Sequence, residues 1–507
     1  MVQSRTNNAK RNIAGAFANK IISMLLQFFI RTVIIYCLGT LYLGLTSLFT
    51  SILQVLSLAE LGFGEAIVFS MYKPLAENNT KNICALLKFY RKIYRVIGVA
   101  VLAVGFSFTP FVPKIITGET PADINLYVLY FIHLFNTAVS YFLFAYKRSL
   151  LSAGQRSDIT SNIDTISNLF MGSIQLILLF LFRNYYLYCI VIPLTTIASN
   201  IIQNYITDKM YPDYKCYGEL EKNEIKEIKK RVTGLFLYKV CGVFRNSFDS
   251  IVVSAFLGLT ILAKYNNYYY IINAVTAIMT IITGSIIAGV GNSMVLEDKQ
   301  KNYKDFQKFQ FIYMWLSSLC TVCLFCLYQS FVKLWVGEEL LFDNLTMGIF
   351  CIYFFSLRMG DICYTYRQAA GLWWHDKFRP VVEVVMNFVL NIILVKYIGT
   401  VGVLLSTIIC IIFINTIWGA RVLFKYYFYE VRQSNYHLKL LYFGIITAIS
   451  CAIAWYICSF ISIGGIFELF ARGLVCTIVS NIIMLIAYFK MPEAKESFLF
   501  IKKLIMH

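Results

Sequence analysis

The sequence predicts an all-α protein that crosses a membrane many times. Of its 507 residues, 59% are hydrophobic and only 14% are charged, and the mean hydropathy is +0.67. Soluble domains usually hold about 25% charged residues. Stretches such as 96–110 and 478–489 hold no charge, and apolar segments of roughly 20 residues, enough for one helix to cross a bilayer, recur along the chain. The alternating pattern of a membrane β-barrel is missing.

About 14 transmembrane helices fit the apolar segments best. Twelve remain if two of the weaker divisions between spans are wrong. The first span is too long for the core of a signal peptide, and no small-residue cleavage site follows it, so we expect a retained first helix. The expected spans are 13–38, 43–72, 96–113, 124–146, 159–182, 185–206, 232–257, 265–293, 311–332, 343–366, 380–397, 400–420, 440–461 and 466–489.

Positive charge is concentrated in every second connection. One set of connections and the two ends hold 34 of the 45 Lys and Arg, whereas the opposite connections and their edges hold five. Because cytoplasmic loops carry an excess of Lys and Arg, this split predicts a multi-pass protein of the cytoplasmic membrane with both termini in the cytoplasm. The net charge of +18 then follows from topology, and we expect no nucleic acid partner.

Several enzyme classes are disfavoured. The outer connections are too short for the extracytoplasmic domain of a membrane polymerase or ligase. The phosphate loop G-x-x-x-x-G-K-[ST] is missing, which excludes ATP hydrolysis by that route, and no acidic loop suits a metal-dependent glycosyltransferase. Cys320, Cys323 and Cys326 lie in an apolar span without a nearby His or acid, so we expect packed, reduced thiols and no metal. The sequence favours a protein that is not an enzyme.

A faint repeat divides the chain. Several features of the first half recur in the second half at nearly one common spacing. Lys10, Arg11, Lys20 and Leu38-Gly39 are matched by Lys229, Lys230, Lys239 and Leu257-Gly258, and Lys81-Asn82 is matched by Lys301-Asn302. Six spans per period predict a parallel pseudo-repeat of two six-helix lobes, 1–206 and 232–425. A basic loop, 207–231, joins them, and two extra helices with a cytoplasmic tail occupy 426–507.

Charged and polar residues inside the first span share one face. At 100° per residue, Lys20, Gln27 and Arg31 fall within a sector of about 40°. An unpaired charge at the bilayer centre costs at least ~2.5–3.5 kcal/mol, so this face should avoid lipid. We expect the three residues to bind substrate. The alternative is a structural role for Arg31 with Lys20 snorkelling to the cytoplasmic surface.

The matching helix of the second lobe is also polar. Its candidates fan over about 120°, and two of them are one turn apart, as i and i+4. They are Lys239, Arg245, Asn246 and Asp249. If the lobes oppose each other, both helices can line one cationic cavity. A buried ion pair is again the alternative, with Lys239 snorkelling.

Other acids inside spans are weaker candidates. Glu60 and Glu65 flank glycines in "AELGFGEAI", and glycine-broken helices mark ion sites in transporters, although a flexible helix end explains the pattern nearly as well. Asp164 and Glu383 are lone acids, and the sequence is equally consistent with their facing the cavity and with their facing away from it. Four residues are expected to form two structural pairs, namely Arg358 with Asp361 and Glu468 with Arg472. In "GLWWHDKFRP" (371–380), we expect an interfacial Trp belt and a solvated His375.

The segment "LGTLYLGLTSLFTSILQVLSLAELGFGEAIVFSMYKPLAE" (38–77) resembles the second-helix region of polysaccharide flippases of the Wzx type. These belong to a superfamily (multidrug/oligosaccharidyl-lipid/polysaccharide exporters) that also includes lipid II flippases and multidrug extruders. The resemblance covers essentially the whole chain, because the twelve-helix repeat, the two extra helices and the basic loop near 207–231 are similar too. The motif itself is moderately specific, since it is mostly hydrophobic.

The resemblance implies a flippase that moves an undecaprenyl-pyrophosphate oligosaccharide to the outer leaflet for capsule or surface polysaccharide assembly, by alternating access. It implies a Na⁺ or H⁺ gradient as driving force, no cofactor, and other polysaccharide-assembly proteins as partners. Relatives place essential basic residues on the first helix, a position that Arg31 and Lys20 match; Lys239 and Arg245 are assigned by the repeat alone. Thr32 stands where lipid II flippases have an acid, which disfavours lipid II.

The residues are consistent with that substrate. The forked guanidinium of Arg suits phosphate, and protonation or Na⁺ binding at Asp249 could release Arg245 to hold the pyrophosphate. "YNNYYYIINA" (265–274) offers Asn266, Asn267 and tyrosines to sugars, or forms an interfacial aromatic belt. A multidrug exporter of the same fold is the remaining alternative, but it should have an acidic cavity to hold cationic drugs.

Overall fold

The computed structural model describes residues 5–57, 63–154, 156–372 and 375–505, with only the backbone described at 5–18, 233–239, 285–289 and some single positions. These residues form helices joined by short turns, and none of them forms a strand. Within this described part, ten helices are long and apolar enough to cross a membrane, or eleven if one bent pair is a single span. The all-α, polytopic fold class is therefore confirmed.

The helices follow the predicted spans, with differences at their ends and breaks. The second predicted span comprises two helices, α2 (Thr40–Leu56) and α3 (Phe63–Ala76). The spans predicted at 380–397 and 400–420 belong to one helical run, Arg379–Tyr426, which is broken at Ile398 and Gly399 by non-helical backbone angles. The bent pair is α5 (Leu126–Phe142) and the segment 145–153, which meet at 53°.

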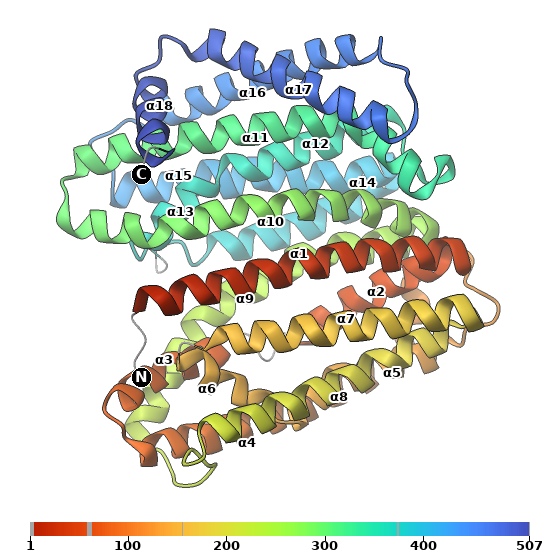
Figure 1. The fold of residues 1–507 in the computed structure, drawn as a ribbon, viewed down its shortest axis with the longest axis vertical. Helices are drawn as coiled ribbons and strands as arrows, with labels where there is room; N and C mark the ends of the chain where they lie inside the picture. The colour runs from red at the N-terminus through yellow and green to blue at the C-terminus, as the bar shows by residue number, and fades with distance from the viewer. Residues whose placement is uncertain (1–4, 58–62, 155, 373–374, 506–507) are drawn as a thin grey trace. The chain divides into compact units, whose positions relative to one another are not determined.

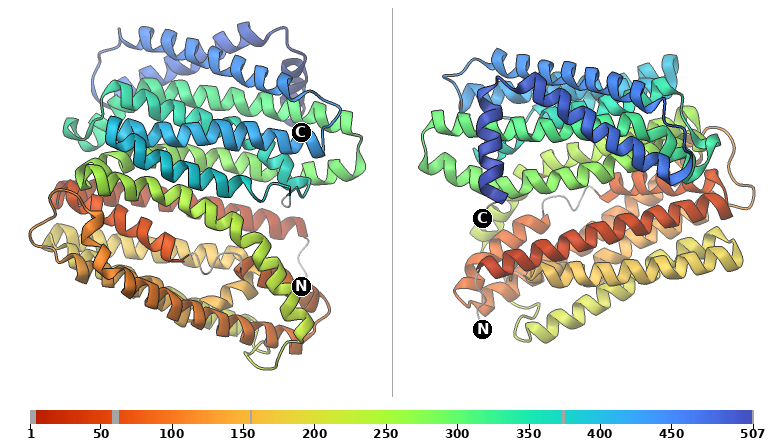
Figure 2. Two further views of the ribbon diagram at one scale, coloured as in Figure 1. Left: turned by 180° about the vertical axis from the view of Figure 1, so that it is seen from behind. Right: turned by 45° about the horizontal axis from the view of Figure 1, so that its top comes forward.

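Contacts divide the chain into two compact units, Met1–Ala263 and Lys264–His507. In the first unit, α1 (Arg5–Cys37) packs along α7, and α2 packs along α9. The helix α5 packs against both α4 and α8, as Figures 1 and 2 show. The bounds of the others are α4 Thr80–Phe108, α6 Arg148–Ala153, α7 Ser157–Phe182, α8 Tyr185–Met210 and α9 Lys222–Leu257.

The second unit is built around α11, which contacts α12, α16, α17 and α18. The run that begins with α14 continues as a π-helix, η6 (Ile411–Trp418), and then as α15 (Gly419–Tyr426). The other bounds are α10 Leu259–Leu296, α11 Lys299–Val336, α12 Asn344–Met359, α13 Asp361–Ala369, α14 Arg379–Cys410, α16 Gln433–Cys458, α17 Gly465–Tyr488 and α18 Pro492–Ile505. The lobe boundaries at 206 and 232, drawn from the repeat, stay a prediction.

Repeated sequence positions adopt repeated backbone conformations. Gly39, between α1 and α2, has φ 108° and ψ 174°, and its repeat partner Gly258, between α9 and α10, has φ 88° and ψ 174°. These angles are strained for any residue with a Cβ atom, so glycine is needed at both junctions. Asn79 caps α4 and Asp298, at the same spacing along the chain, caps α11, each by accepting a backbone N–H. The helix starts therefore repeat with the sequence.

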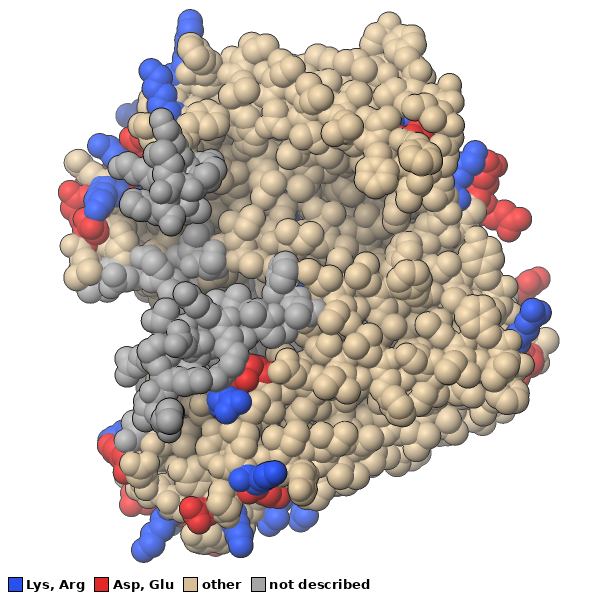
Figure 3. Space-filling view, in the orientation of Figure 1, with Lys and Arg blue, Asp and Glu red and all other residues tan. Residues whose placement is uncertain are grey.

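The described surface is apolar along the middle of the helices. Large hydrophobic side chains stay exposed on both units, for example Leu181 at 70% and Phe467 at 74%. On the face shown in Figure 3, the charged side chains of each unit gather mainly toward the ends of its helices, and uncharged residues cover the stretch between. An apolar belt of this kind is what the hydrocarbon core of a bilayer requires.

Candidate substrate and ion-coupling site

Helix α1 is attached to α7 through small polar side chains. The Asn19 amide donates to the Ser161 carbonyl at 3.0 Å and to Thr165 Oγ1 at 2.9 Å. Farther along, the Asn168 amide donates to Ser23 Oγ at 3.2 Å. These bonds satisfy polar groups that hydrocarbon could not, so they fix which face of α1 meets α7.

The predicted substrate residues of α1 lie on a different side of that helix. Lys20, Gln27 and Arg31 are roughly 80° round the helix axis from the stripe that faces α7. Lys20 and Gln27 are exposed, and Arg31 is half-buried. The structure thus places the three residues together on a face that α7 does not cover.

Arg245 and Asp249 lie one turn apart on α9, the helix that packs along α2. Asp249 is only 6% exposed and Arg245 is half-buried, and neither is without an interaction partner. Between them, Ser247 Oγ donates to Oε1 of Gln54 on α2 at 3.2 Å. The negative charge of a buried carboxylate needs a positive partner, and an arginine four residues earlier on the same helix can supply one.

The C-terminal end of α9 is fixed within the same unit. The hydroxyl of Ser254 donates to the Ile115 carbonyl at 3.0 Å, and the Thr117 N–H donates to the Ser254 carbonyl at 3.2 Å. A Cβ atom at Gly258 would come within 2.7 Å of the Thr117 oxygen. Asp249 therefore lies a little over one turn below a closely packed junction, which limits how far this part of α9 can move.

Four predicted site residues cannot be placed. Glu60 lies outside the described residues. Glu65 is on α3, and Lys239 and Asn246 are on α9, but their side chains lie outside the described part. Their roles in substrate binding or ion coupling stay predictions. Arg31 and the pair Arg245–Asp249 belong to different helix packings of the first unit, α1 on α7 and α9 on α2.

The second unit contains a buried charge network that the sequence did not reveal as a group. Asp376 accepts from Arg379 at 2.7 and 3.0 Å and from Arg367 at 3.3 Å. Arg379 also donates to Glu383 at 3.1 Å and to Asn415 at 2.8 Å. The four charged side chains are between 2% and 7% exposed. With two arginines and two acids, the network is neutral, as a buried ionic cluster must be to persist.

A polar ladder continues from this network along α14. Asn387 donates to Thr407 Oγ1 at 2.9 Å, and Asn391 donates to Asn387 at 3.2 Å. Ser406 donates to Asn391. The ladder follows Arg379 and Glu383 at steps of four residues, a spacing that places all of them on one helix face. That spacing is visible in the sequence and is the signal that could have predicted the network.

The lone acids are therefore paired. Glu383 contacts Arg379, and Asp164 of α7 pairs with Arg148 of α6. Arg148 is on a different helix from Asp164, whereas Arg379 is four residues before Glu383 and lies just outside the predicted span 380–397. Considering each span by itself therefore left both acids without partners. The expectation that Glu383 is a lone acid is therefore wrong, because it pairs with the buried Arg379, which is 2% exposed.

The two predicted structural pairs are confirmed. Arg358 Nη1 lies 2.9 Å from Asp361, and Tyr313 bridges them by donating to Asp361 and accepting from Arg358. Arg472 lies 2.8 Å from Glu468 and also donates to Ser330 Oγ on α11 at 3.0 Å. Each arginine contacts its acid within the second unit.

Cysteine thiols gather where α11, α16 and α17 meet. The sulfurs of Cys326, Cys458 and Cys476 all lie within 4.8 Å of one another in an apolar cluster. The described cysteines are free thiols, as expected. Among the described residues, this group is the one whose ligand atoms could meet at a single soft metal ion. The expectation of no metal is not tested by this arrangement.

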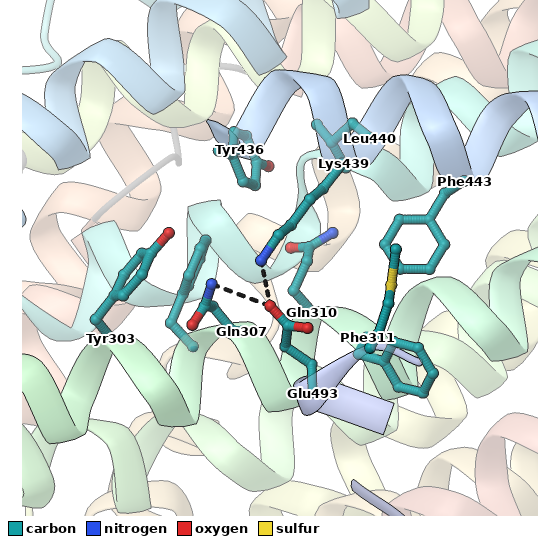
Figure 4. A pocket seen from close by; sticks show the side chains of 11 residues that line it. Tyr303, Gln307, Gln310, Phe311, Tyr436, Lys439, Leu440, Phe443 and Glu493 are labelled. Atoms are coloured by element: carbon teal, nitrogen blue, oxygen red, sulfur yellow. Dashed lines mark hydrogen bonds and ion pairs between the residues drawn. The ribbon is translucent and has the colours of Figure 1, made fainter. Parts of the chain in front are cut away.

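A small pocket lies between α11, α16 and α18 (Figure 4). Its empty volume is about 410 Å³, and its walls are mainly aromatic and aliphatic. Glu493 of α18 is the polar centre, because it pairs with Lys439 of α16 and accepts from Gln307 of α11 at 3.2 Å. Since these polar groups satisfy one another, the pocket serves to attach α18 to the two longer helices.

Solved structures share this fold across nearly the whole chain. One titled "Lipid II flippase MurJ, inward closed conformation" matches at a TM-score of 0.66 with 17% identity, covering 95% of this chain and 99% of that one. An inward-facing multidrug resistance MATE family transporter of the MOP superfamily matches at 0.60, with 13% identity, covering 79% and 94%. The chain has a transporter fold.

A third structure extends this result. A variant of the Vibrio cholerae MATE transporter VcmN matches at a TM-score of 0.56 with 13% identity, covering 84% of this chain and 98% of that one. No known family profile and no curated protein sequence matches the chain. Identities this low establish the fold, and substrate has to be argued from the residues.

Proposed function

We propose that the chain is a flippase of this transporter superfamily, in the cytoplasmic membrane with both termini cytoplasmic. Its proposed substrate is an oligosaccharide on a polyprenyl pyrophosphate carrier, undecaprenyl in bacteria, moved from the inner to the outer leaflet for surface polysaccharide assembly. The observation that carries the proposal is a full-length transporter fold combined with the basic, acid-free first helix. Alternating access between two helical lobes would move the headgroup while the lipid tail stays in the bilayer.

The charge of α1 supports an anionic headgroup. Its sequence, Arg5–Cys37, holds five basic residues and no acid, and Lys20, Gln27 and Arg31 lie away from its contact with α7. Arg binds phosphate through two parallel hydrogen bonds, and a pyrophosphate offers several acceptor oxygens. In a site with little water, a pair of such bonds gives both affinity and orientation.

Coupling is proposed at Asp249. With Asp249 ionised, Arg245 is held one turn away on α9; when Asp249 binds Na⁺ or a proton, Arg245 becomes available to the pyrophosphate. The burial of Asp249 supports this step, because a carboxyl at the edge of a dry site responds strongly to an ion. Glu60 and Glu65 remain further candidates for coupling, and polysaccharide-assembly proteins remain proposed partners.

Lipid II is the second candidate substrate. The lipid II flippase structure matches over 95% of this chain, and lipid II carries the same pyrophosphate chemistry. Thr32, directly after Arg31, disfavours it by the resemblance described above. Multidrug export is less well supported, since a basic α1 would repel cationic drugs.

Transport in liposomes tests the proposal. A fluorescent polyprenyl-pyrophosphate oligosaccharide is incorporated, and its arrival at the outer leaflet is followed with and without a Na⁺ or proton gradient. We expect gradient-stimulated transfer that Arg31→Ala and Arg245→Ala lower at least tenfold and that Asp249→Asn uncouples from the gradient. Lipid II and a cationic dye serve as competing substrates.

Matched variants separate a site effect from a general charge effect. Arg95→Ala removes an exposed arginine of α4 in the same unit, and Glu119→Gln removes an exposed acid of that unit; both should transport normally. Normal transport by both arginine variants would overturn the site. Export of the dye by folded wild-type protein that moves no lipid-linked sugar would instead establish a drug exporter.

A further inference from the structure

A second basic region lies in the other unit, where the helical run of η6 and α15 ends. An open hollow there has an empty volume of about 980 Å³. Its basic side chains are Arg421 and Lys425 of α15 and His375 of the turn before α14, and none of its lining residues is acidic. We name this feature the basic–aromatic hollow.

These cations differ from four other arginines of the unit. Arg358, Arg367, Arg379 and Arg472 each contact a carboxylate within 3.3 Å. Arg421 and Lys425 are exposed, and among the described residues neither is within ion-pair distance of an acid. Positive charge is therefore available in the hollow.

Aromatic rings shape the hollow around these cations. The His375 ring packs on Tyr426 with centroids 4.1 Å apart, which holds the turn over the end of α15. Lys425 Nζ lies 5.3 Å from the same tyrosine ring, and Trp418 contributes to the wall. Trp and Tyr prefer the level of lipid headgroups, with one side apolar and the other hydrated.

An apolar track continues from the cations toward the middle of the run. Phe413 and Ile417 line the same hollow, and with Arg421 and Lys425 they are spaced at four-residue steps. Phe413 is 61% exposed. The rise per residue puts Phe413 about 18 Å from Lys425 along the helix, so basic groups lie at one end and exposed apolar groups at the other.

We propose that the basic–aromatic hollow binds an anionic phospholipid of the cytoplasmic leaflet. Arg421, Lys425 and His375 contact the phosphate, and one acyl chain lies along Ile417 and Phe413. The shared chemistry, a phosphate group, could also come from free phosphate or a polyprenyl phosphate. The apolar track adjoining the cations argues against free phosphate, and basic pockets between helices on the cytoplasmic side are suited to anionic headgroups.

This site does not depend on the proposed transport activity. It lies in a different unit from Arg31 and Arg245, and its ligand is a bilayer component at high concentration. The competing structural explanation is that Arg421 and Lys425 only extend to the membrane surface and favour the C-terminal end of a helix dipole. That role requires positive charge but gives no preference for a particular headgroup.

Quenching of Trp418 measures the binding. Full-length protein is placed in phosphatidylcholine nanodiscs, and phosphatidylglycerol with brominated chains is added in increasing fractions. The part of the fluorescence quenching that disappears in the Trp418→Phe variant reports on lipid bound in the hollow. We expect brominated phosphatidylglycerol to quench at a far lower fraction than brominated phosphatidylcholine. Replacing both Arg421 and Lys425 by Ala should weaken binding about 30-fold, from about 1 kcal/mol per basic residue.

The matched control removes two lysines from a comparable surface. Lys299 and Lys304 line a neighbouring hollow that also contains Glu430, and replacing both by Ala should change binding less than about threefold. Exchanging the two cations, Arg421→Lys with Lys425→Arg, should retain binding and shows that loss in the double alanine variant is not misfolding.

Four results would overturn the proposal. They are unchanged quenching in the double alanine variant, an equal loss in the Lys299 and Lys304 control, displacement of the lipid by millimolar inorganic phosphate, and preferential binding of a polyprenyl phosphate over phosphatidylglycerol. The last result would assign the hollow to a carrier lipid instead.

Discussion

Two groups of positive charge, the buried Arg367 and Arg379 near the start of α14 and the basic face of α1, are neutralised differently. Arg379 is 2% exposed and contacts Asp376, Glu383 and Asn415. On α1, Lys20 is exposed, Arg31 is half-buried, and the helix contributes no acid of its own. A complete neutral network indicates a structural role, whereas an excess of one sign on an accessible face is typical of a binding role.

Removing the centre of the network should have the largest effect. Arg379→Ala leaves two buried acids, Asp376 and Glu383, and a single arginine, Arg367, in the network. We therefore expect the free energy of unfolding to fall by about 3–5 kcal/mol. Unfolding of purified protein in mixed micelles measures this change. Arg432→Ala, at an exposed arginine of the same unit, is the control. Equal stability of the two variants would show that the network is not structural.

The polar ladder should contribute less than the charges. Asn387→Ala leaves Thr407 and Asn391 each short of one partner, and we expect a loss of about 1–2 kcal/mol in the same unfolding assay. Asn435→Ala, at an exposed asparagine near the start of α16, should change stability by far less. A loss as large as that of Arg379→Ala would mean that the ladder and the network act as one unit.

The sequence predicted the helices better than the side-chain partners. Hydropathy placed the break at 398–399, and the internal repeat paired Gly39 with Gly258, because backbone geometry and apolar length act locally. The partner of Asp164 was missed because Arg148 is on another helix, and that of Glu383 because Arg379 was assigned to the connection before the predicted span rather than to the same helix. Arg358 with Asp361 was predicted correctly because side chains three positions apart in a helical segment are neighbours, however the helices pack.

A different outcome is expected on α1. Arg31→Ala should lower transport at least tenfold, about 1.4 kcal/mol in the barrier, while the free energy of unfolding changes by less than about 1 kcal/mol. Arg31→Lys should recover part of the activity because charge stays but the bidentate fork is lost. Stability falling together with transport, as for Arg379→Ala, would make Arg31 structural and remove the contrast between the two regions.

The smallest effect is expected at Asp343, which directly precedes the membrane span that begins at Asn344 in the structure. Asp343 caps α12 by accepting from the Thr346 hydroxyl and from its N–H at 3.2 Å, and the hydroxyl contact above all lowers the pKa of this carboxyl. A lowered folded-state pKa stabilises the protein at pH values above the unfolded-state pKa of about 4, and that stability is lost as pH falls through the folded value. Asp343→Ala should cost about 1 kcal/mol near neutral pH.

Asp343→Asn separates the cap from the charge. Asparagine caps helices as well as aspartate, so at pH 7 this variant should be nearly as stable as the wild type, and between about pH 5 and 2 it should lose less stability than the wild type. Helix stability measured by hydrogen exchange at the start of α12 provides the local readout. If Asp343→Asn and Asp343→Ala are equally destabilised at pH 7, the contribution is the charge near the helix N-terminus rather than the hydrogen bonds.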